Sequence, residues 1–141
     1  MDLKVKKLHP DAIVPKFANH ADAGMDLYSI EDCAINPGEV HKVKTGIAME
    51  LPEGYVSLIW DKSGLATKYS IKTIGGVIDA GYRGEYIVGL INLGKEAYQL
   101  KKGDKVSQLL IQRIERPNIE LVEELSNSER GANGFGSTGK K

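Results

Sequence analysis

Apolar and polar residues alternate with a period of two along most of the chain, a pattern typical of half-buried β-strands. The run 47–51 has its apolar residues on one face and ends at the turn signal Pro-Glu-Gly at 52–54. The run 56–60 then alternates again. The pattern predicts two strands joined as a hairpin-like unit.

Other runs read as strands of the same kind. Residues 39–44 follow the turn dipeptide Pro-Gly at 37–38. Residues 86–91 are almost wholly apolar, as expected for a strand covered on both faces. The remaining predicted strands are 106–114, which follows the turn 102–104, and 119–125.

Only residues 63–69 read as helix, and they allow no more than two turns. Many short strands between Gly and Pro turns predict an all-β fold, a distorted jelly roll or β-sandwich with one short helix. The apolar pattern stops near Ser126, and the segment beyond it holds one large apolar side chain, Phe135. We therefore predict a catalytic body at 1–125 and a flexible C-terminal arm at 126–141.

Composition narrows the class of protein. Lys+Arg and Asp+Glu are both 19, which argues against a nucleic-acid or membrane partner. Cys33 is the only cysteine, so no disulfide forms within one chain, and we expect a reducing, cytoplasmic setting. We find neither a signal-peptide pattern nor an apolar run of membrane-spanning length.

The segment 76–84, Gly-Val-Ile-Asp-Ala-Gly-Tyr-Arg-Gly, carries the most chemistry. Its glycines allow the backbone to approach a ligand closely. A fixed carboxylate, Asp79, beside an exposed aromatic ring, Tyr82, suits a small-ligand pocket. The alternative is an ordinary hairpin turn, since Asp and Gly are common turn residues.

Three further features could bind a charged ligand. Lys62, Ser63 and Gly64 precede the short helix, where backbone N–H groups attract anions, although Ser63 could simply be an N-cap. Asp26 interrupts an apolar strand and must face polar partners there. The glycine-rich tail holds Arg130 and Phe135, and its alternative reading is a disordered terminus.

Five segments in this order resemble the five ordered motifs of the dUTPase family. They extend over most of the chain: 23–28 (AGMDLY), 62–66 (KSGLA), 76–84 (GVIDAGYRG), 103–109 (GDKVSQL) and 130–139 (RGANGFGSTG).

The resemblance implies hydrolysis of dUTP to dUMP and pyrophosphate, with Asp79 activating the attacking water. The backbone of the Asp79 turn would read uracil, and Tyr82 would pack on deoxyribose and exclude a 2′-hydroxyl. Phe135 would stack on the base as the arm closes. The remaining substrate-binding residues implied are Gly76, Val77, Ile78 and Ile87, and for the phosphates Lys62, Ser63, Gly64, Gln108, Arg130, Gly136, Ser137 and Thr138.

The resemblance also implies Mg²⁺ as cofactor, with Asp26 near the metal through water, and a homotrimer whose three subunits share each site. The commonest family pattern has Pro-Arg where this chain has Asp61-Lys62. Lysine supplies charge without a bidentate fork.

Two other functions stay open. A dCTP deaminase shares the fold and the Asp79 turn, but the position matching its catalytic glutamate is Gly89. A regulatory module could bind the nucleotide on this scaffold without catalysis.

Overall fold

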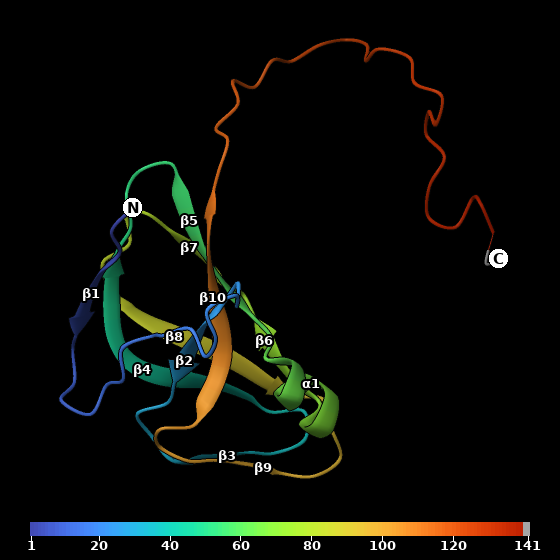
Figure 1. The fold of residues 1–141 in the computed structure, drawn as a ribbon. Helices are drawn as coiled ribbons and strands as arrows, with labels where there is room; N and C mark the ends of the chain where they lie inside the picture. The colour runs from blue at the N-terminus through green and yellow to red at the C-terminus, as the bar shows by residue number, and fades with distance from the viewer. Residues whose placement is uncertain (140–141) are drawn as a thin grey trace.

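The computed structural model describes residues 1–139, whose regular structure is almost all β-strand (Figure 1). The helix has the predicted bounds, and no helix in this part of the chain is long and apolar enough to cross a membrane. The elements in order are β1 (Lys4–Lys7), β2 (Met25–Tyr28), β3 (Cys33–Ile35), β4 (Val40–Glu50), β5 (Tyr55–Trp60), α1 (Ser63–Tyr69), β6 (Ile71–Ile74), β7 (Val77–Asp79), β8 (Glu85–Asn92), β9 (Tyr98–Leu100) and β10 (Lys105–Arg113).

The strands form two four-stranded antiparallel sheets and one small ladder. One sheet has the order β1-β4-β8-β6, the other has the order β2-β10-β5-β7, and β3 pairs with β9. Their inner faces enclose one apolar core. This arrangement confirms the predicted all-β sandwich of short strands with one short helix.

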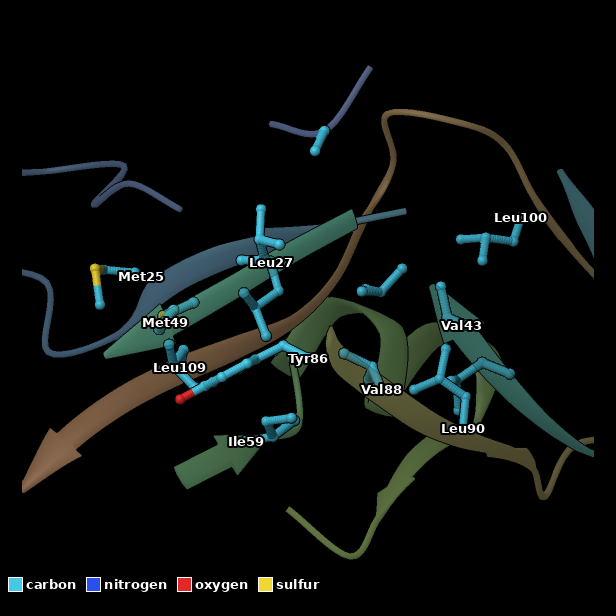
Figure 2. Close-up of a cluster of buried hydrophobic side chains, with 14 of the residues drawn as sticks. Met25, Leu27, Val43, Met49, Ile59, Tyr86, Val88, Leu90, Leu100 and Leu109 are labelled. Carbon is cyan, nitrogen blue, oxygen red and sulfur yellow. The ribbon is translucent and has the colours of Figure 1, made fainter. Parts of the chain in front are cut away.

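The core also contains a polar link between the two sheets. Tyr86 of β8 is fully buried among apolar side chains of both sheets (Figure 2). Its hydroxyl lies 2.9 Å from Oγ of Ser57, a buried residue of β5 in the other sheet. A satisfied buried pair of this kind fixes how the two sheets face each other.

The predicted hairpin pairing is wrong. β4 and β5 lie in different sheets, so the turn 52–54 carries the chain from one sheet to the other. The Asp79 turn is likewise a crossing, because β7 pairs with β5 whereas β8 pairs with β4 and β6. Period-two alternation marks a strand but does not say which strand lies next to it.

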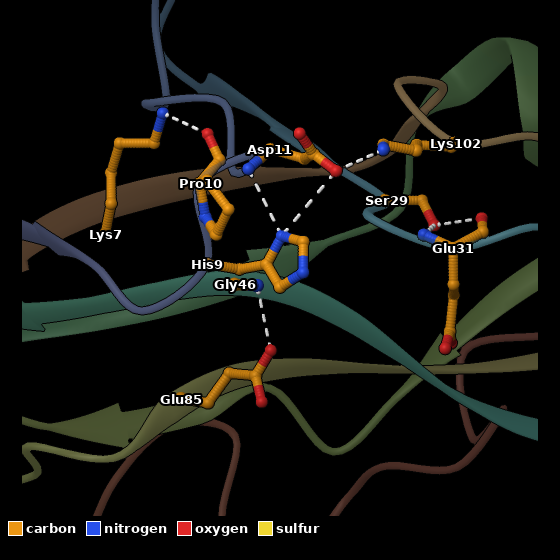
Figure 3. Close-up of polar contacts among 9 residues, drawn as sticks. All are labelled: Lys7, His9, Pro10, Asp11, Ser29, Glu31, Gly46, Glu85 and Lys102. Carbon is orange, nitrogen blue, oxygen red and sulfur yellow. Dashed lines mark hydrogen bonds and ion pairs between the residues drawn. The ribbon is translucent and has the colours of Figure 1, made fainter.

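β4 unites two predicted strands, 39–44 and 47–51, across a register shift between Lys44 and Ala48. Gly46 lies in this bulge with φ 68°. Its N–H donates to the Glu85 carboxylate over 2.8 Å (Figure 3). The bulge explains why the apolar pattern breaks here although the strand continues.

β8 confirms the predicted strand 86–91, with alternate residues fully buried and the others half-buried. The predicted strand 119–125 is wrong, since residues 114–139 form neither helix nor strand. Ile119 and Leu121 are almost fully exposed there, and the chain runs outward from the end of β10 (Figure 1). An alternating segment becomes a strand only where a sheet edge receives it. The division at 125/126 stays a prediction, and residues 140–141 of the arm lie outside the described residues.

Gly46 provides a test of the bulge. A Cβ at Gly46 would lie 2.9 Å from Cβ of Ala12 and would require a left-handed backbone. We expect Gly46→Ala to lower the free energy of unfolding by more than about 1–2 kcal/mol, the strain expected of left-handed backbone alone. Gly38→Ala is the control, because Gly38 has φ 78° but no atom within 4 Å of the added Cβ. The free energy of unfolding of both variants is measured with urea. If both lost the same amount, the close packing around Gly46 would contribute nothing to the effect.

Candidate functional site

Five of the residues predicted at the nucleoside site line one cavity of about 260 Å³. Its volume is slightly below the usual range for small-molecule sites, roughly 300–1,000 Å³, so it suits only part of a nucleotide. The lining residues are Val77, Ile78, Asp79, Tyr82, Glu85 and Ile87. Glu85 was not predicted from the sequence.

Local bonds fix the shape of this pocket. The Tyr82 N–H donates to the carbonyl of Asp79 over 3.1 Å, and the Tyr82 hydroxyl donates to the carbonyl of Glu85 over 3.1 Å. A Cβ on Gly84 would collide with the Tyr82 hydroxyl, so only glycine allows this ring position. The turn therefore holds Tyr82 beside the exposed Asp79 at the end of β7.

Gly76 shows a second close approach. A Cβ on Gly76 would lie 2.6 Å from the carbonyl oxygen of Ile59, and its φ is 112°. The Gly76 carbonyl accepts from the Ile59 N–H over 2.8 Å. Glycine thus lets β7 begin directly against β5.

A second cluster surrounds Asp26 of β2, which is 4% exposed. Lys62 Nζ donates to its Oδ1 over 2.7 Å. Lys105 Nζ forms an ion pair with Oδ2 at 2.6 Å. Burial alone would raise the pKa of Asp26, but Lys105 and Lys62 outweigh it, and the pKa lies below its ordinary value. Two ammonium groups on one carboxylate leave one net positive charge.

The other predicted phosphate residues lie beside this cluster. Gln108 of β10 is in register with Asp26, and its Nε2 donates to the carbonyl of Asp61 over 2.9 Å. Lys62 is the N-cap of α1 and makes no side-chain cap bond. Ser63 and Gly64 are exposed in the first turn, so Ser63 is not an N-cap.

The pocket and the Asp26 cluster lie apart in one chain. Asp79 is opposite Val56 and Gln108 is opposite Trp60 on the same strand, β5. Four residues along a strand span roughly 13 Å, and β7 and β10 flank β5 at roughly 4.8 Å on either side.

The arm is separate from both groups. Its hydrogen bonds join arm residues to each other, as where Arg130 Nε donates to the Asn133 carbonyl over 2.8 Å. Phe135 is fully exposed, and the arm extends away from the body (Figure 1). Gly136, Ser137 and Thr138 lie in its last described turns. The predicted site residues therefore form three groups, which one chain does not bring together.

A larger cavity contains none of the predicted site residues. It measures about 590 Å³ and lies between the end of α1 and residues 94–99, which run into β9. Lysines and acidic residues line this cavity, but it lacks the arrangement seen at Asp79, where a carboxylate lies beside a small apolar pocket. We therefore place the site at the smaller cavity.

Besides Glu85, two charged residues near the site were not predicted, Lys105 and Asp61. A buried acid in β2 signals that a cation must lie nearby, but only the strand order shows that β10 supplies it. Residues 1–139 bring together no group of three or more His, Cys, Asp or Glu side chains that could hold a metal ion.

Comparison with known proteins gives a consistent family. A dUTPase family model matches residues 11–139. The deoxyuridine 5'-triphosphate nucleotidohydrolase of Clostridioides difficile is 52% identical over 140 residues and covers 98% of each chain. That of Clostridium tetani is 50% identical over 140 residues, covering 98% of this chain and 97% of its own.

Solved structures agree with this. The Staphylococcus bacteriophage 80alpha dUTPase with dUPNHPP has a TM-score of 0.93, 33% identity and 98% coverage of both chains. A variant dUTPase from phage phi11 of S. aureus, solved to show the coordination of a structural Mg(II) ion, has a TM-score of 0.83 and 31% identity. It covers 88% of this chain and 98% of its own.

The Asp26 cluster predicts a pH-dependent stability. The pKa of Asp26 in the folded protein lies below its ordinary value of 3.8. The stability that its ion pairs contribute is therefore fully present above pH 3.8 and is lost as the pH falls through the pKa of the folded state. We expect Asp26→Asn to lower the free energy of unfolding at pH 7 by about 1.5–3 kcal/mol. The deficit should shrink in acid, as measured by urea unfolding at fixed protein concentration.

Glu50→Gln serves as the control, because the Glu50–Lys4 pair is exposed. It should change stability little at either pH. If the loss of stability in Asp26→Asn were the same in acid as at pH 7, the stabilisation by Asp26 would not come from its ion pairs.

Proposed function

The chain belongs to the dUTPase family, and we propose that it hydrolyses dUTP to dUMP and pyrophosphate with Asp79 as the catalytic carboxylate. The observation that carries this assignment is the pocket at the end of β7. There a solvent-accessible carboxylate borders a small cavity lined by Val77, Ile78 and Ile87.

The pocket suits a pyrimidine deoxynucleoside. The backbone of 76–78 would pair with the polar edge of uracil, and its closeness would exclude a 5-methyl group. Tyr82 would pack on the deoxyribose and leave no room for a 2′-hydroxyl. Support comes from the bond that holds its hydroxyl on Glu85 and from the Tyr86 ring, 6.3 Å away.

Asp79 would act as general base toward water. It accepts a proton as the water oxygen bonds to the α-phosphorus in line with the leaving group. The bond from the α-phosphorus to the bridging oxygen then breaks, and pyrophosphate departs with that electron pair. No covalent enzyme intermediate is needed, so positioning and electrostatics provide the acceleration.

The phosphates would lie on Lys62, Ser63, Gly64 and Gln108. The net positive charge of the Asp26 cluster favours an anion there. When bound with the triphosphate, Mg²⁺ would neutralise its charge. A cation held mainly by phosphate oxygens and water fits a chain whose described residues form no ligand cluster. An indirect metal role for Asp26 stays a prediction, since both its oxygens face ammonium groups.

We propose that the complete site is formed by a homotrimer. Its support is the separation of the three groups of site residues along one chain. Exposed apolar side chains give a second reason, because exposed apolar surface favours association. They include Trp60, Val77, Ile119, Leu121 and Leu125.

In this assembly the arm would close over the nucleotide. Phe135 would stack on uracil, and Arg130 with Gly136, Ser137 and Thr138 would bind phosphates. Ordering the arm costs entropy but excludes water from the reaction. A cytoplasmic location remains part of the proposal, supported by the single free thiol Cys33.

Gly89 argues against the deaminase alternative. A Cβ there would lie 2.8 Å from Cγ1 of Ile74 and 3.1 Å from its carbonyl oxygen. A glutamate at this position has no space without moving β6. The binding-module alternative leaves Asp79 without a role.

Replacing Asp79 tests the reaction. We expect Asp79→Asn to lower the kcat for dUTP by about 10²–10⁴-fold, the usual contribution of a general base. Asp22→Asn, an exposed carboxylate outside both clusters, should retain full activity. Pyrophosphate release is measured with dUTP, dCTP, dTTP and UTP. Ammonia from dCTP would favour the deaminase, and binding without either product would favour the regulatory module.

Mixing two inactive variants tests the shared site. Asp79→Asn and a chain lacking residues 126–141 should each be nearly inactive alone. After unfolding and refolding together, mixed trimers should regain about a quarter of the sites, those combining an intact Asp79 with an intact arm from different chains. No recovery, although light scattering shows mixed trimers, would mean that the arm serves its own chain.

A further inference from the structure

Asp61 is a charged residue where the commonest family pattern has proline, and it lies between β5 and α1. Its Oδ1 accepts from the Thr73 N–H over 2.6 Å and from the Thr73 hydroxyl over 2.8 Å. Its Oδ2 accepts from Lys72 Nζ over 2.7 Å. Burial alone would raise the pKa of Asp61, but these partners outweigh it and lower the pKa.

The backbone of Asp61 is tied as well. Its carbonyl accepts from Gln108 Nε2 over 2.9 Å. Thr73 belongs to β6 in one sheet, whereas Gln108 belongs to β10 in the other. One residue therefore joins both sheets just before Lys62 and Ser63.

These bonds matter because packing does little to hold the helix. α1 spans only Ser63–Tyr69 and has no fully buried residue, and among its side chains Leu65 alone is a partly buried apolar group packed against the core. At its end, Ser70 adopts a left-handed conformation and leads directly into β6. The bonds between Asp61 and Thr73 thus join the two ends of the segment 61–73, which contains α1.

We propose that Asp61 is a positioning residue for the triphosphate, holding Lys62, Ser63 and Gly64 in place by tying the chain to Thr73. The inference rests on the proposed function. A segment fixed before binding loses less conformational entropy when the ligand arrives. Asp61 itself faces Thr73 and Lys72 and would not contact the substrate.

Binding of two nucleotides of different length tests this role. The non-hydrolysable analogue dUpNHpp uses the whole phosphate chain, whereas dUMP depends mainly on the pocket at Asp79. Both are titrated with Mg²⁺ into full-length wild type and Asp61→Ala. We expect the Kd for dUpNHpp to rise about tenfold. The Kd for dUMP should change by less than about twofold, since the pocket is bonded separately.

Three further variants define the cause. Asp61→Asn keeps the Oδ1 acceptor and should restore most of the affinity for dUpNHpp. Lys72→Met should bind dUpNHpp as wild type does. Lys72 is half-exposed, and it contacts Oδ2 of Asp61, so its loss leaves both bonds to Oδ1 in place. Thr73→Val removes one of the two Oδ1 bonds and should give a smaller loss in the same direction, which also serves if Asp61→Ala folds poorly.

An unchanged Kd for dUpNHpp in both Asp61→Ala and Thr73→Val would overturn the inference, as would equal losses for dUpNHpp and dUMP. Equal losses indicate a general effect on folding. If wild type itself failed to bind dUpNHpp, the proposed function would fail first, so the two failures are distinguishable.

Discussion

The register of β5 is the constraint on which the arrangement of the site depends. This strand pairs with β7 on one side and β10 on the other, with Val56 opposite Asp79 and Trp60 opposite Gln108. Backbone ladders set these positions, so side-chain rotation cannot bring the two groups together. The proposed nucleoside pocket and phosphate cluster are thus built rigidly, at a separation that the proposed homotrimer would bridge. In this proposal the rigidity of the sandwich and the need for assembly have the same origin.

The buried Asp26 organises the phosphate side by charge. An unpaired carboxylate at 4% exposure would be costly, so it holds two cations, Lys62 just before α1 and Lys105 at the start of β10. Removing either lysine would leave the carboxylate balanced by one cation, with no net positive charge. The excess charge that would favour an anion therefore depends on both lysines, and the side chain of Lys105 remains half-exposed.

Patterns that depend on neighbours in the chain were predictable. The helix 63–69, the strand at 86–91 and the turn at Asp79 all follow from local periodicity and glycine placement. Pairing was not, because alternation is the same whether a strand folds back or crosses to the opposite sheet. The failed strand 119–125 has the same cause, since its apolar face has no partner in a single chain. Lys105 and Asp61 were not predicted as site residues, because their importance comes from contacts with residues far along the chain.

The pair Asp61-Lys62 can be understood as one adaptation rather than two substitutions. An arginine fork fixes its own direction against a phosphate or carboxylate through two parallel bonds, whereas an ammonium group is a point charge on a flexible stem. With lysine at position 62, the position of the charged group depends on how firmly the backbone of this residue is held. Proline would stiffen that backbone through its ring. Asp61 instead fixes it from outside, through Thr73 in one sheet and Gln108 in the other. The loss of side-chain geometry at one residue is thus offset by tertiary bonds at the residue before it.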